Sequence, residues 1–161
     1  MAARVGVAGR TPHRAVAAHR GRALRRPRPR TVVLTPAIAS AQTFTGGPYD
    51  LVTSFDCLHD MGDPLGAARH VRDMLAPGGT WMVVEPYAGG HVTDNLNPVG
   101  RVYYSFSTFL CVPSALSQDG GYSLGAQAGE EPLARLAADA GFARFRRVAE
   151  TPFNIVYEGR R

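Results

Sequence analysis

The sequence predicts an α/β fold built on a parallel sheet, and three neighbouring stretches of the chain carry that prediction. Apolar and β-branched residues over 51–57 follow a Gly-Gly-Pro turn and are typical of a strand. Apolar residues at helical spacing over 64–76 predict a helix. A second apolar run over 80–85 is short and rich in Val, as in a strand buried on both faces. Strand, helix and strand in this order predict a right-handed βαβ unit.

The ends of the central helix are marked by the residues that flank it. Asp63 is suited to accept a backbone N–H as an N-cap, and Pro64 has the fixed φ of a first helical position. Pro77-Gly78-Gly79 is expected to stop the helix. The apolar positions between these signals predict one buried stripe. The stripe consists of Leu65, Ala68, Val71, Met74 and Leu75.

Polar residues follow both predicted strands at the point where each strand ends. His59 comes after the first strand, and Glu85 closes the second. Ligands of open parallel sheets bind outside the carboxyl ends of the strands. Neighbouring strands lie about 4.8 Å apart. We therefore expect His59 and Glu85 to share one wall of a cleft, with the carboxylate orienting the imidazole.

These segments resemble the class I S-adenosylmethionine-dependent methyltransferases. Tyr49-Asp50-Leu51-Val52 resembles the start of their fourth strand, 65–79 their next helix with its Leu-x-Pro-Gly-Gly stop, and 81–85 their fifth strand. Residues 57–61, Cys-Leu-His-Asp-Met, are similar to the catalytic segment of small-molecule O-methyltransferases, with Met61 in place of the usual Trp. The resemblance covers residues 36–161. It implies a Rossmann-like methyltransferase sheet with flanking helices and a C-terminal antiparallel hairpin.

The resemblance also implies roles for the residues at the strand ends. His59 would be the general base that removes the proton of a hydroxyl group, and Glu85 would hold it in place. The implied cofactor is S-adenosylmethionine, and the implied partner is a small hydroxylated molecule that accepts the methyl group. Cofactor contacts are expected from the segment before the first strand and from the end of that strand. These residues are Ser40, Ala41, Phe55, Asp56 and Cys57.

Several of these residues have an equally simple structural interpretation. His59 could hydrogen-bond the backbone at the strand end, and Asp56 could cap a turn. Ser40 and Ala41 could belong to an ordinary surface loop.

The two cysteines, Cys57 and Cys111, lie far apart and lack a second pair of metal ligands. This pattern predicts buried, reduced thiols in a cytoplasmic protein and no zinc site.

The cofactor-binding half of the resembled family has no clear counterpart in the chain. That half contains a Gly-x-Gly-x-Gly loop against the methionine part of the cofactor, and an acidic residue for its ribose. Gly6-Val7-Ala8-Gly9 lacks the spacing, and no Asp or Glu precedes Asp50. The N-terminal part is therefore expected to be truncated or degenerate, with impaired activity. The alternative function is a non-catalytic remnant or interaction protein, whose open sheet edge could join a partner chain, including a second copy in a homodimer.

The first 35 residues differ from the rest in charge. Residues 1–30 hold nine Arg and no acidic residue, so the net charge of +5 resides there. Little stable structure is expected before about Thr31, with a short strand over 31–34. Three explanations compete for this leader: a frame artefact, a nucleic-acid-binding arm, and a targeting or disordered tail. Nucleic acid is disfavoured because no aromatic residue is interleaved with the arginines.

The C-terminal half predicts two more helices and a hairpin. Asn97-Pro98 repeats the cap-and-proline signature, and helical spacing predicts a helix over 98–111, before Pro113. Its aromatic residues Tyr103, Tyr104 and Phe106 belong either to the core or, by the resemblance, to a lid that binds the substrate.

A third helix opens at Pro132 and closes at Gly141. Strands over 142–150 and 153–158 are expected to pair antiparallel. No apolar run approaches the length of a membrane span.

Overall fold

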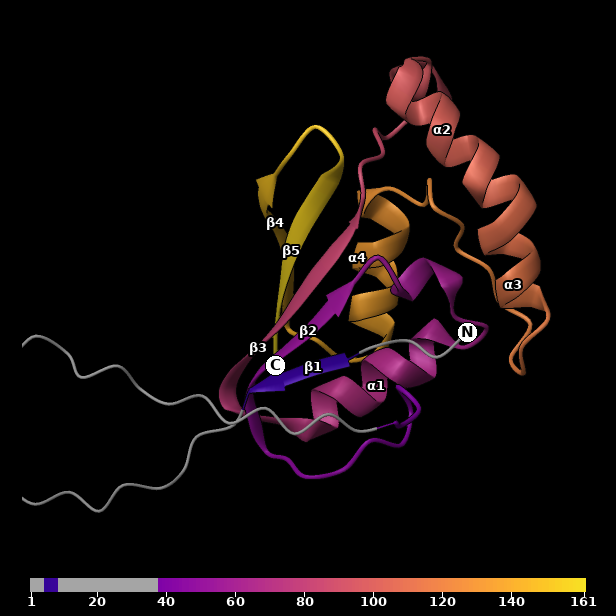
Figure 1. Ribbon diagram of the computed structural model, residues 1–161. Coiled ribbons are helices and arrows are strands. Elements are labelled where there is room, and N and C mark those ends of the chain that lie inside the picture. Colours follow the sequence, from indigo (N-terminus) through magenta and orange to yellow (C-terminus); the bar gives the residue numbers. More distant parts are fainter. Residues whose placement is uncertain (1–4, 9–37) are drawn as a thin grey trace, which may run out of the picture.

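One mixed sheet forms the centre of the computed structural model, which describes residues 5–8 and 38–161. Its five described strands lie in the order β1-β2-β3-β5-β4 (Figure 1). The strands are β1 (Val5–Ala8), β2 (Tyr49–Phe55), β3 (Leu75–Pro86), β4 (Arg144–Glu150) and β5 (Asn154–Arg160). Strands β2 and β3 pair parallel, whereas β4 and β5 form the predicted antiparallel hairpin, with β5 next to β3.

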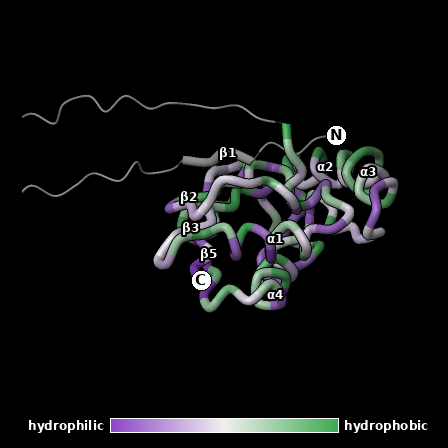
Figure 2. Tube along the Cα trace, turned by 90° about the horizontal axis from the view of Figure 1, so that it is seen from below, coloured by the Kyte–Doolittle hydropathy of each residue, from purple (hydrophilic) through white to green (hydrophobic). Residues whose placement is uncertain are grey.

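Helices α1 and α4 cover one face of this sheet, and α2 and α3 lie farther out, beyond them (Figures 1 and 2). The helices are α1 (Pro64–Met74), α2 (Pro98–Phe106), α3 (Val112–Leu116) and α4 (Glu130–Asp139). Short 3-10 turns span Leu58–Asp60 and Val92–Asn95, and a π turn spans Ser107–Cys111. Within the described residues, no helix is long and apolar enough to cross a membrane.

The core lies between the sheet and the pair α1 and α4. Trp81 on β3 is 1 % exposed, donates its indole N–H to Ser54 Oγ at 3.0 Å, and stacks on Phe142. Burial alternates along β3 from Trp81 to Pro86, so the expectation of a strand buried on both faces is wrong for the described structure. Alternation arises because the described helices α1 and α4 pack on one face only.

Both predicted cap-and-proline signatures open helices. Asp63 Oδ1 accepts the backbone N–H of Gly66 at 2.7 Å, and Asn97 Oδ1 accepts that of Gly100 at 2.9 Å. Helix α1 ends earlier than expected, because Leu75 already has an extended backbone and buries its side chain in the core. The Pro77-Gly78-Gly79 stop lies inside β3, where the register to β2 shifts.

The helix expected over 98–111 continues to Leu116. Pro113 lies in the first turn of α3, and the π turn before it contains a bond from the Val112 N–H to the Ser107 carbonyl. Pro113 has no N–H to donate to the preceding turn, and the wider π turn just before it lets the helical path continue past this position.

Five large apolar side chains of this helical segment are at least half exposed: Val102, Phe106, Phe109, Leu110 and Leu116. The core interpretation of the helix's aromatic residues is therefore wrong for Phe106 and Phe109, whereas Tyr103 and Tyr104 are partly buried.

Strand β1 was not expected, because the sequence predicted little stable structure before about Thr31. Its backbone pairs antiparallel with β2, from Val5 opposite Ser54 to Ala8 opposite Leu51. The pairing satisfies backbone groups that β2 would otherwise expose at the sheet edge. The strand expected over 31–34 lies outside the described residues, as does most of the 1–35 leader.

The Asp63 cap of α1 gives a stability test. Asp63→Ala should lower the free energy of unfolding by about 1 kcal/mol, because one N-terminal N–H of the helix loses its acceptor. Chemical denaturation monitored by circular dichroism measures the change. Asp73→Ala on the exposed side of the same helix is the control and should change stability by less than about 0.5 kcal/mol. Equal effects of the two substitutions would contradict the cap.

Candidate active site

The chain leaves β2 through a turn at the same sheet edge where β3 ends. Phe55 lies opposite Val84 in the parallel register, and the Asp56 N–H donates to the Val84 carbonyl at 2.8 Å. Asp56 has φ +43°, a left-handed conformation that short polar side chains tolerate. This bend redirects the chain into the turn Leu58–Asp60, which carries His59 back over the end of β3.

His59 and Glu85 form a buried pair at this edge. Their side chains join through His59 Nδ1 and Glu85 Oε2 at 2.5 Å, and the two residues are 5 % and 3 % exposed. The second carboxylate oxygen of Glu85 accepts the Leu58 N–H at 2.9 Å. An ionised carboxylate only accepts hydrogen bonds, so Nδ1 carries the proton toward Glu85. The other ring nitrogen, Nε2, is therefore left for chemistry.

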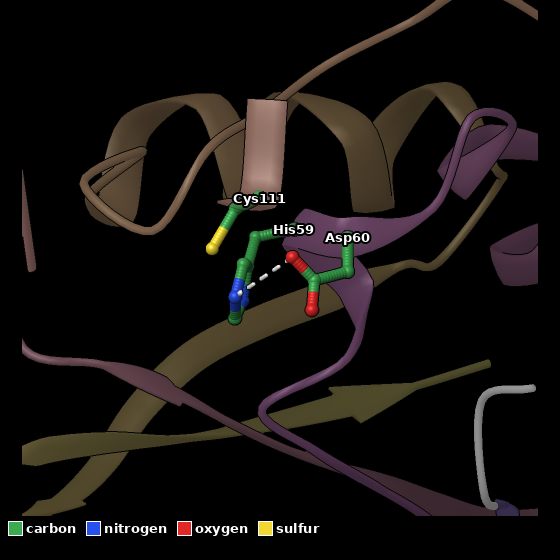
Figure 3. A group of neighbouring side chains, drawn as sticks. All are labelled: His59, Asp60 and Cys111. Atoms are coloured by element: carbon green, nitrogen blue, oxygen red, sulfur yellow. Dashed lines mark ion pairs between the residues drawn. The ribbon is translucent and has the colours of Figure 1, made fainter. Parts of the chain in front are cut away.

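The electrostatic environment favours a protonated imidazole. Burial lowers the pKa of His59, but the hydrogen bond and charge of Glu85, with Asp60 and Asp56, outweigh it. The pKa therefore lies above its usual 6.5. Glu85 contributes most to the rise, and Asp60 follows it, with its Oδ1 3.4 Å from Nε2 (Figure 3).

Asp56 and Asn154 close the edge from the side of the hairpin. Asn154 Nδ2 donates to Asp56 Oδ1 at 2.8 Å. Burial raises the pKa of Asp56, and the nearby charge of Glu85 adds to the rise. Tyr103 donates its hydroxyl to the Phe153 carbonyl at 2.8 Å, which ties α2 to the same hairpin turn. The carboxyl edge thus gathers residues from β2, β3, α2 and the hairpin.

The residues expected to contact the cofactor have different environments. Phe55 is 55 % exposed beside Asp56 at the strand end. Cys57 is buried in the core, and burial together with the charge of Glu85 raises its thiol pKa to about 12, so it stays uncharged. Ser40 is exposed and bonds the Gln42 side chain, while Ala41 is buried in the core. Their part in cofactor binding stays a prediction.

The three candidate substrate residues are spread over α2. Tyr103 contacts the hairpin turn, and Phe106 is 53 % exposed. Tyr104 lines an open groove of about 380 Å³ together with Arg101 and Phe109. The described lining of this groove includes neither residue of the imidazole–carboxylate pair.

Two residues at this edge escaped sequence reasoning. Cys111 has its sulfur close to His59 and Asp60 (Figure 3), although Cys111 lies 51 positions after Asp60 in the sequence. Asn154 reaches Asp56 across the sheet because β5 pairs with β3. A polar residue at the start of a hairpin strand was a weak signal for Asn154. The sequence contains no signal for the π turn that places Cys111 near His59.

A family model described as a methyltransferase domain matches residues 7–144. The chain belongs to this methyltransferase family. The match confirms the resemblance seen in the sequence, and it begins farther toward the N-terminus than residue 36. No curated protein sequence matches the chain.

Solved structures of methyltransferases share the fold. The chain is 21 % identical to PigF with SAH, with a TM-score of 0.53, over 75 % of this chain and 33 % of that one. For human N-acetylserotonin methyltransferase in complex with SAM, identity is 17 %, the TM-score 0.56, and coverage 77 % and 32 %. The chain is 16 % identical to the mitomycin 7-O-methyltransferase MmcR, with a TM-score of 0.51, over 76 % of this chain and 33 % of that one. The chain therefore spans about a third of these structures, and the Rossmann-like methyltransferase fold is confirmed.

The raised pKa of His59 is open to direct measurement. The imidazole should titrate above pH 6.5 in an NMR titration of its ring protons. Glu85→Gln should move this midpoint to lower pH, because it removes the hydrogen-bonded negative charge that favours the protonated ring. An unchanged or higher His59 midpoint in Glu85→Gln would contradict the electrostatic account.

Proposed function

We propose that this domain takes part in S-adenosylmethionine-dependent methyl transfer to a hydroxyl group of a small molecule, with His59 as general base. The observation that carries the proposal is the buried His59–Glu85 pair at the carboxyl edge of two parallel strands. Membership of a methyltransferase family supports the reaction type. The pair supports the choice of a protic acceptor, because an acceptor that loses a proton requires a base.

His59 can act as a base through Nε2 while Glu85 holds Nδ1. A phenol has a pKa near 10 and a free imidazole one of about 6.5, so proton transfer must accompany formation of the methyl–oxygen bond. A raised pKa makes the imidazole of His59 a stronger proton acceptor. Glu85 then stabilises the imidazolium, since its carboxylate is already within hydrogen-bonding distance. The same rise requires a pH high enough to keep the ring neutral beforehand.

The charges at this edge fit a cationic methyl donor. Asp56, Asp60 and Glu85 all act electrostatically on His59, which places three carboxylates around the strand ends. The apolar ring of Phe55 is exposed next to them. Bound S-adenosylmethionine would supply a sulfonium methyl group, which leaves by in-line displacement. The residues of this chain would align the acceptor and receive its proton, while Asp56 and Phe55 would contact the donor.

The named relatives support a small acceptor. One of the solved structures is a mitomycin 7-O-methyltransferase and another is an N-acetylserotonin methyltransferase, and two were solved with SAH or SAM. By this analogy, the acceptor would approach His59 from the side of α2, where Tyr103, Tyr104 and Phe106 offer aromatic contacts.

Cofactor affinity separates this proposal from a non-catalytic role, because the chain lacks a Gly-x-Gly-x-Gly loop. Isothermal titration calorimetry of the full chain with S-adenosylhomocysteine should give saturable binding heat. Asp56→Ala should weaken this binding, whereas His91→Ala should not. No binding heat at millimolar ligand would favour the non-catalytic alternative, in which the domain acts through a partner chain.

Removal of the imidazole tests the base. His59→Ala should slow transfer of a radiolabelled methyl group to a panel of phenols by roughly 10²- to 10⁴-fold, the usual contribution of a positioned base. Its affinity for S-adenosylhomocysteine should stay close to that of the unmodified chain. The matched control is His91→Ala, which removes an exposed imidazole from the loop after β3. Unchanged turnover in His59→Ala would exclude His59 from the mechanism.

A further inference from the structure

Three potential metal ligands of different chemistry lie close together, and one of them is His59 of the His59–Glu85 pair. One ligand atom each from His59, Asp60 and Cys111 lies within 4.8 Å of the others. The first two belong to the turn after β2, and the third comes from the π turn after α2 (Figure 3). His59 and Cys111 are 5 % and 4 % exposed, and Asp60 is partly exposed. The cluster is therefore largely shielded from solvent, and Asp60 is its most exposed member.

The spacing suits a small tetrahedral ion. Zinc bonds of about 2.0–2.3 Å at tetrahedral angles put ligand atoms roughly 3.3–3.8 Å apart. His59 Nε2 and Asp60 Oδ1 already lie 3.4 Å apart. Since all three ligand atoms lie within 4.8 Å of one another, a contraction of at most about 1 Å completes the geometry.

Two further observations indicate a ligand at this place. Asp60 Oδ1 is buried and has no hydrogen bond of ordinary length within the described structure, but it faces the imidazole Nε2 at 3.4 Å, and Asp60 also bonds the Cys111 side chain. The carboxylate is thus directed at both of the other ligands. Glu85 holds the far ring nitrogen of His59, as carboxylates do behind zinc-bound histidines. Both features are expected of a metal site and of its supporting shell.

We propose that His59 Nε2, an Asp60 carboxylate oxygen and Cys111 Sγ form a binding site for Zn²⁺, with a fourth position open to water. Thiolate, imidazole and carboxylate together are typical zinc ligands, whereas Mg²⁺ and Ca²⁺ prefer oxygen ligands alone. Binding forms a zinc–sulfur bond and releases the thiol proton to solvent. Sequence reasoning expected no zinc site because the two cysteines lie far apart in the sequence and lack a second pair of metal ligands.

Zinc at this site would compete with the proposed base. The metal would take the Nε2 lone pair that otherwise accepts the substrate proton, so a zinc-loaded chain should not deprotonate a hydroxyl group. The site itself does not depend on methyl transfer. It follows from the three ligands and can be measured on the chain alone. A failed transfer assay and a failed metal assay are thus separate results.

Cobalt substitution reports directly on the thiolate ligand. Addition of Co²⁺ to the full chain under reducing conditions should produce a near-ultraviolet thiolate-to-cobalt absorption band, and added Zn²⁺ should abolish it. Cys111→Ser should remove the band, and Cys57→Ala, which changes the other buried thiol, should keep it. Asp60→Asn should lower zinc affinity by more than the roughly 10- to 100-fold that a lost supporting residue costs. Histidines elsewhere in the chain cannot give a thiolate band.

Thermal unfolding supplies the second readout. Zn²⁺ should raise the melting temperature of the unmodified chain and of Cys57→Ala, because it binds the folded state, but not that of Cys111→Ser. Circular dichroism first verifies that each variant is folded. Absence of the cobalt band in the unmodified chain, or its persistence in Cys111→Ser, would overturn the proposal. If Cys111→Ser does not fold, Asp60→Asn decides: unchanged zinc affinity in that variant would overturn it.

Discussion

The arrangement of the whole carboxyl edge depends on one carboxylate that serves two partners. Glu85 accepts the backbone N–H of Leu58 with one oxygen and binds the His59 ring with the other. A buried carboxylate is stable only when charge and hydrogen bonds compensate its lost hydration. Here both come from the turn that follows the neighbouring strand. The pair thus fixes where β2 ends relative to β3 and positions the imidazole at the same time.

Local signals predicted the framework of the fold well. The Asp63-Pro64 and Asn97-Pro98 signatures have a short-range cause, hydrogen bonding within one helical turn, and both open helices in the structure. The adjacency of His59 and Glu85 also followed, because the order of strands in a βαβ unit determines which ends meet. Long-range relations were less accessible. Exposure of Phe106 and Phe109 depends on where the helix lies, and helical spacing alone contains no such information.

The proposed base and the proposed metal site both use Nε2 of His59, and both require the same orientation of the ring. A base needs an unprotonated nitrogen with an oriented ring, and so does a metal ligand. Glu85 provides that orientation in either case, which explains why the same residues can support both proposals. Asp60 distinguishes them: its carboxylate favours a charged ring and thereby opposes a neutral base, but it would be a direct ligand of a cation.

The π turn Ser107–Cys111 has a consequence for how this region tolerates changes in length. It contains one residue more than the corresponding turn of an α-helix, and the helical path continues on both sides of it. Deleting a single residue there would leave a regular helical turn and would change both the direction and the height at which Cys111 projects from the helix axis. The thiol would then leave its place beside the imidazole although every side chain of the cluster was retained. Chain length in this segment is therefore as much a determinant of the cluster as the identity of its residues.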